Sequence, residues 1–163
     1  MQHNITKKSS KHHTKSINTT NTKNTTNTTN TAIYTSHILT QFAHDIRTFH
    51  WNTQEYHAHK ISGKLYKKIN EHIDTIIEII ISIQQQKGVK NIQEYTSTHP
   101  STTTTTTTTS TQAMLSSLHN FATQLQENTT PLAKILTNQP ALSAVKDEML
   151  KDIHKATYLM NMQ

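Results

Sequence analysis

Apolar side chains recur at steps of three and four residues along most of the chain after residue 30, which is the period of a helix buried on one face. We expect a first helix from about Thr31 to Trp51 and a second from near Gln54 or Glu55 to Lys87-Gly88. The first stripe comprises Ile33, Tyr34, Ile38, Phe42, Ile46 and Phe49. The second comprises Tyr56, Ile61, Leu65, Ile69, Ile73, Ile76, Ile80 and Ile83.

Two further stripes follow a threonine-rich tract at 97–111. The third comprises Met114, Leu115, Leu118, Phe121, Ala122 and Leu125, and the fourth Leu142, Val145, Met149, Ile153, Ala156 and Met160. Thr130-Pro131 predicts a break after the third stripe, and Pro140 suits the first turn of the fourth helix. No segment alternates as a strand does. The pattern therefore predicts an all-α, antiparallel four-helix bundle with a long connection between helices two and three.

Residues 1–30 lack any such period, so we expect a disordered basic arm followed by one bundle domain, residues 31–163, interrupted by the Thr-rich linker 97–111. The arm holds five of the formal +6 charges, on Lys7, Lys8, Lys11, Lys15 and Lys23. Such an arm can contact nucleic acid without sequence preference. A solvated leader with no partner is an equally good interpretation.

Composition narrows the function classes. The chain has no cysteine, so a metal would have to bind His, Asp or Glu. Neither a signal peptide nor a membrane-spanning run is present, so we expect a soluble intracellular protein with no membrane contact. The absence of a glycine-rich loop and of a Ser/His/Asp arrangement argues against a nucleotide-binding enzyme or a hydrolase.

Histidines and acids gather around the second helix. His50 ends the first helix and His59 lies one turn into the second, so their side chains can approach across the turn, whereas His57 diverges from His59 by about 200°. Asp74 and Glu78 share a helix face, either as metal ligands or as a solvated border. About 22 Å separates His59 from Asp74 along the helix. One ion could therefore bind both the histidines and the acids only if the two pairs come from two different copies of the chain.

Acids also flank the apolar face of the fourth helix. Glu148 and Asp152 lie close to its edge and Asp147 points away. They could hydrogen-bond to the residues that bind a metal without binding the metal themselves. Alternatively, they pair with Lys146, Lys151 or a neighbouring helix.

Two segments carry a resemblance to known families. They read RTFHWNTQEYHAHKISGKLYKKINEHIDTIIE, from residue 47, and VKDEMLKDIHKATYLM, from residue 145. The spacing of His59, Asp74 and Glu78 resembles the ferroxidase signature of the Dps proteins, the DNA-binding ferritins of starved cells. Both segments look more like a divergent ferritin-like family found mainly in large DNA viruses of eukaryotes. The positions that match that family are Trp51, Tyr56, His59, Lys60, Leu65, Tyr66, Asp74, Glu78, Asp147, Glu148, Tyr158 and Leu159.

The resemblance implies a ferritin-like bundle that binds iron at His50, His59, Asp74 and Glu78 in a homodimer or larger homo-oligomer, in the cytoplasm, a virion or a viral factory. Two departures weaken this expectation. The first two histidines are nine residues apart, three fewer than is usual in Dps, and Gly63 stands where both families usually place an acid. We therefore expect weak ferroxidase activity at most. The alternative is a non-catalytic ferritin-like structural or interaction protein.

Overall fold

Regular structure in the described part of the chain is entirely helical. The computed structural model describes residues 20–86 and 110–162, and side chains from residue 33 onward. The helices are α1 (Thr20–Asn52), α2 (Tyr56–Gln86), α4 (Thr111–Gln126), α5 (Pro131–Thr137) and α6 (Pro140–Asn161).

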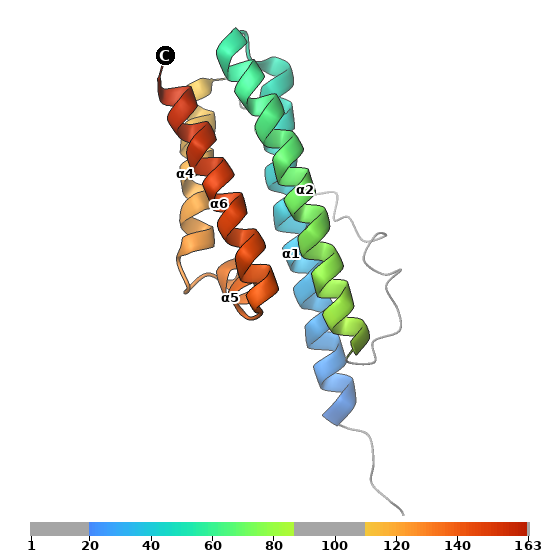
Figure 1. Cartoon of the computed structure of the whole chain (residues 1–163). Coiled ribbons are helices and arrows are strands. Elements are labelled where there is room, and N and C mark those ends of the chain that lie inside the picture. The colour runs from blue at the N-terminus through green and yellow to red at the C-terminus, as the bar shows by residue number, and fades with distance from the viewer. Residues whose placement is uncertain (1–19, 87–109, 163) are drawn as a thin grey trace, which may run out of the picture.

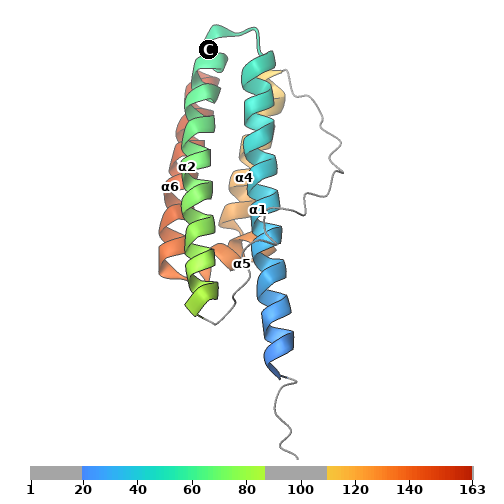
Figure 2. The same ribbon diagram turned by 90° about the vertical axis from the view of Figure 1, so that its right-hand side faces the viewer.

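The four longer helices pack side by side and the short α5 lies near one end of α4 and α6 (Figure 1). Seen from the side, α2 lies beside α6, and α1 lies beside α4 (Figure 2). α1 and α6 run in one direction while α2 and α4 run in the other. The Thr111 hydroxyl donates to Glu55 Oε2 at 2.8 Å, so α4 begins at the end of the molecule where α2 also begins.

The core lies between the helices and consists mostly of residues of the expected stripes, to which Leu39 of α1 and Leu132 and Leu136 of α5 are added. Its fully buried members include Leu39, Ile46, Phe49, Ile69, Ile76, Met114, Leu118, Leu125, Leu132, Leu136, Met149 and Ile153. The Phe42 and Phe121 rings stack with centroids 3.6 Å apart and join α1 to α4. Burying large apolar side chains of this kind contributes roughly 1.5–3 kcal/mol each, which makes the core the main source of stability.

Not all residues of the expected stripes are buried: Tyr34 and Tyr56 are exposed, and Ile33, Ile38, Ile83 and Val145 are only partly buried. Tyr56 is 77% exposed because it is the first residue of α2, at the end of the bundle. Tyr34 is 40% exposed because the buried residue of its turn is Thr35, which continues at helical steps into Leu39 and Phe42.

α1 begins earlier than the sequence pattern indicates. It starts at Thr20, so residues 20–30 are helical and the expectation of a disordered arm is corrected for them. A helix nucleated by a buried segment adds one hydrogen bond per residue as it extends, which does not require an apolar face. Residues 1–19 and most of the Thr-rich linker, residues 97–109, lie outside the described residues.

Pro131 and Pro140 act as the sequence predicts. They occupy the first turns of α5 and α6, where a missing backbone N–H has no consequence. The Thr130 hydroxyl caps α5 by accepting the Ala133 N–H at 3.2 Å. None of the helices described combines the length and the apolar character that a membrane crossing requires.

Candidate metal centre

The corner between α1 and α2 brings His50 and His59 together. α1 closes with a hydrogen bond from the Thr53 N–H to the Phe49 carbonyl at 2.9 Å, and α2 begins three residues later at Tyr56. The two imidazole rings stack with centroids 4.0 Å apart and planes inclined by 25°. The expected close approach of these two histidines is therefore observed.

Each of these rings also hydrogen-bonds to the backbone of the other residue. His50 Nδ1 lies 2.9 Å from the His59 carbonyl oxygen, and His59 Nδ1 lies 2.8 Å from the His50 carbonyl oxygen. A carbonyl can only accept, so both Nδ1 atoms carry the proton and donate it. The His50 carbonyl belongs to the last turn of α1 and has no partner within that helix, so His59 caps α1.

This hydrogen bonding fixes the chemistry of the free ring edge. With Nδ1 protonated, Nε2 is the nitrogen that holds the lone pair of a neutral ring, and neither Nε2 has a hydrogen-bond partner among the described residues. Metal-bound histidines are usually held in this way, with the second ring nitrogen donating to a carbonyl or carboxylate.

Gly63 makes room for the His50 ring. A Cβ atom at this position would lie 2.8 Å from His50 Cε1 and 3.1 Å from His50 Nδ1, closer than side chains tolerate. Glycine is unfavourable inside a helix by about 1 kcal/mol relative to alanine. Here that cost is offset because the ring packs directly on the α2 backbone.

His57 and His59 lie on opposite sides of the first turn of α2. His57 Nε2 lies 3.3 Å from the Leu159 carbonyl, in the last turn of α6. The expected divergence of the His57 and His59 side chains is thus observed. As a result, one turn of α2 contacts the C-terminal ends of both α1 and α6. In this arrangement each of the two histidines hydrogen-bonds to a carbonyl oxygen in the last turn of a neighbouring helix.

The expected acidic ligands lie elsewhere. Asp74 and Glu78 are exposed on α2, and helical rise places Asp74 about 22 Å from His59. Across residues 20–86 and 110–162, no three His, Asp or Glu side chains are grouped so as to hold a metal ion. Within residues 33–86 and 110–162, the buried polar and charged residues are Thr35, Thr53, Ser62, Gln84 and Lys146, which include no carboxylate or imidazole. Any metal site at the candidate residues would therefore need acids from a second copy.

The acids of α6 pair within this chain, in line with the simpler interpretation. Glu148 bonds Lys151 at 3.1 Å on the exposed face. Asp152 lies 2.9 Å from His72 Nε2 across the α2/α6 interface, where both side chains are largely covered. Asp147 lies 3.3 Å from Lys146.

Comparison with known proteins identifies no relative. No family model matches the chain, and no curated protein or solved structure is significantly similar to it.

The sequence pattern did not predict a cation–π cluster beside the corner. The Arg47 guanidinium lies over the Trp51 ring at 5.0 Å and near the Tyr66 ring at 5.8 Å, and Nη2 donates to His44 Nδ1 at 3.2 Å. The spacing of four residues between Arg47 and Trp51 is a signal that could have predicted the first contact.

Asp45 is a second residue that the sequence did not single out. Partial burial raises the pKa of its carboxyl group, an effect opposed by the hydrogen bond from Gln41 Nε2 at 2.8 Å and by the nearby His44. Burial disfavours the ionised form, so this carboxylate lowers stability when it is charged.

Proposed function

We propose that the chain is a ferritin-like protein that binds ferrous iron between two copies. His50 and His59 of one copy and Asp74 and Glu78 of the other would form the site. The packing of α1, α2, α4 and α6 supports the ferritin-like part. α2 and α4 run in the same direction, as helices two and three do in a bundle with one long crossover.

The observation that carries the proposal is the reciprocal hydrogen bonding of His50 and His59. Both Nδ1 atoms are engaged at 2.8–2.9 Å, which leaves both Nε2 atoms as basic nitrogens on oriented rings. Asp74 and Glu78 support it as exposed carboxylates one turn apart, accessible to a second copy.

The ring geometry limits how iron can bind. Imidazole ligates in the plane of its ring, and two planes inclined by 25° meet far beyond the about 2.1 Å of a metal–imidazole bond. One ion cannot therefore take both nitrogens without a change of rotamer. We propose one nitrogen to each of two ions, with the carboxylates of the second copy completing the ligand sets.

Iron uptake by the full chain tests the proposal. Ferrous iron added in air should develop ferric absorbance faster than buffer alone, and Asp74→Asn should remove the difference. Asp74 is exposed and has no ion pair in the described residues, so this variant should keep its fold. His154→Ala, at an exposed histidine of α6, is the matched control and should behave as the unmutated chain.

Mixing two inactive variants tests the sharing between copies. His59→Ala and Asp74→Asn chains, each without uptake, should recover part of it when combined, because one of the two sites in a mixed dimer is then intact. A monomeric mass with iron present, or no recovery on mixing, would reject the shared site.

The second candidate is a non-catalytic ferritin-like scaffold. The same pair of hydrogen bonds favours it, because holding the corner between α1 and α2 together explains both histidines without any metal. Under either candidate, we propose that the basic arm makes non-specific contact with nucleic acid through its lysines.

A further inference from the structure

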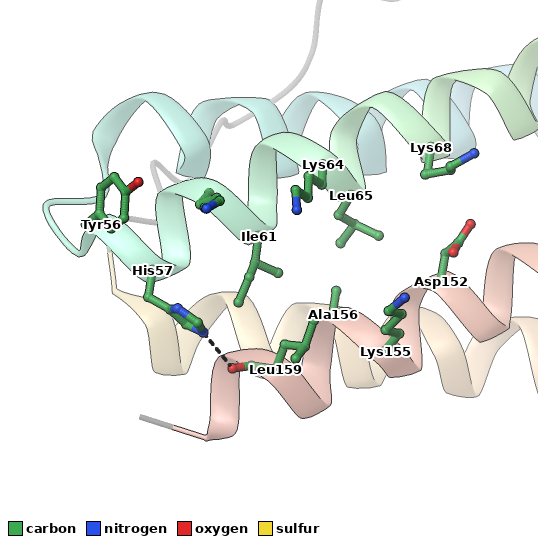
Figure 3. A pocket seen from close by; sticks show the side chains of 11 residues that line it. Tyr56, His57, Ile61, Lys64, Leu65, Lys68, Asp152, Lys155, Ala156 and Leu159 are labelled. Carbon is green, nitrogen blue, oxygen red and sulfur yellow. Dashed lines mark hydrogen bonds between the residues drawn. The ribbon is translucent and has the colours of Figure 1, made fainter.

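A groove lies between α2 and α6, on the other side of α2 from the His50–His59 pair. It has a volume of about 410 Å³ and runs from Tyr56 and His57 toward Lys68 and Asp152. Figure 3 shows Ile61 and Leu65 reaching from α2 toward α6, with Ala156 and Leu159 opposite them. These four apolar side chains form its floor.

The rim of the groove is strongly basic. Lys60, Lys64 and Lys68 line it from α2 and Lys155 lines it from α6. Lys68 is already paired with Glu71 at 2.9 Å, and Asp152, the one acid among the described residues that line the groove, is paired with His72. Among the described residues, Lys60, Lys64 and Lys155 have no ion-pair partner. The groove thus presents unpaired cations above an apolar surface.

We propose that this groove binds a small anionic amphiphile, namely a fatty carboxylate. The apolar chain lies on Ile61, Leu65, Ala156 and Leu159, and the carboxylate lies among the ammonium groups of Lys60, Lys64 and Lys155. Charge complementarity selects the anionic head, because a neutral or cationic ligand would leave these ammonium groups unpaired.

The size of the groove favours a small molecule over a partner helix. A volume of about 410 Å³ lies within the range of small-molecule sites. A helix docked in a groove needs apolar anchors over about two turns, whereas α2 contributes only Ile61 and Leu65, one turn apart.

Calorimetric titration of the full chain with octanoate, decanoate and dodecanoate tests the site. Each added methylene that reaches the floor should tighten binding up to about fourfold. Decanol should bind at least tenfold more weakly than decanoate, and added salt should weaken only the carboxylate.

Lysine variants locate the head group. The double variant Lys64→Ala, Lys155→Ala should weaken decanoate binding about tenfold. The matched control Lys67→Ala, Lys151→Ala removes two exposed lysines of the same helices that do not line the groove, and it should change binding less than twofold. All four positions are polar rim or surface sites, so far-ultraviolet circular dichroism should be unchanged.

Three outcomes would overturn the proposal. The first is no saturable binding of dodecanoate, and the second is equal loss in the rim variant and the control. The third is a dimer in solution that blocks carboxylate binding and dissociates in the rim variant, because the occupant would then be a second copy. None of these outcomes depends on iron, so they are distinct from a failure of the metal site.

Discussion

Replacing Gly63 by alanine should have opposite effects on stability depending on whether His50 is present. In a helix interior this change normally stabilises by about 1 kcal/mol. Here the new methyl group would lie 2.8 Å from His50 Cε1, so the ring has to leave its position. The variant therefore trades a gain in helix propensity against the contacts of the His50 ring.

The lost contacts outweigh the gain. Displacing the ring breaks the hydrogen bond from Nδ1 to the His59 carbonyl and the stack on the His59 ring. These are worth about 1 kcal/mol each. We expect Gly63→Ala to destabilise the chain by about 1 kcal/mol when His50 is present and to stabilise the His50→Ala variant by about 1 kcal/mol. The coupling energy is then about 2 kcal/mol.

Urea unfolding of the four chains, followed by circular dichroism, measures this cycle. Equal slopes of free energy against urea would show that the variants unfold from comparable states. Ser82→Ala is the matched control, since Ser82 is exposed on α2 far from the corner and should give the same change with or without His50. If Gly63→Ala stabilises both backgrounds equally, His50 does not pack on Gly63 and the account of the corner is wrong.

Two further predictions concern Asp45 and the arm. Asp45→Asn should raise the free energy of unfolding at neutral pH, and this gain should disappear as the pH falls and Asp45 becomes protonated in the unmutated chain. The reason is that a carboxyl group whose pKa is raised in the folded state stabilises the fold only in its protonated form. If urea unfolding gives the same difference in free energy between the two chains at every pH, this prediction is wrong. Deleting residues 1–19, which removes Lys7, Lys8, Lys11 and Lys15, should reduce the salt dependence of DNA retention by roughly 0.9 in log–log slope per lost phosphate contact. If the deletion leaves DNA retention unchanged, the basic arm does not contact DNA.

Local periodicity predicted most of the helices and most of their buried faces, but on α1 it selected Ile33, Tyr34 and Ile38 where the structure buries Thr35 and Leu39. Every core residue expected on α4 is buried, and Pro131 and Pro140 begin new helices as expected. Periodicity does not say where a neighbouring helix stops. Tyr56 was therefore assigned to the core, although it lies at the end of the bundle in the structure.

The candidate site was predictable only in part. Chain proximity across a short corner predicted that His50 and His59 would meet. Their bonding to each other's backbone carbonyls depends on the angle between α1 and α2, which no spacing in the sequence encodes. The same holds for His72 and Asp152, eighty residues apart, which meet only because α2 packs on α6.

The two departures from the ferritin-like pattern, the short spacing of the histidines and Gly63, are related through the structure. A corner only three residues long places the His50 ring directly over position 63 of α2, at a distance that no Cβ tolerates. An acid at position 63 would carry that Cβ, so an inward His50 and a carboxylate at 63 exclude each other. The ring instead gains a hydrogen bond and a stacked partner, and the corner is held without a metal. The iron site proposed above keeps these contacts, because it uses Nε2 alone and takes its carboxylates from another copy.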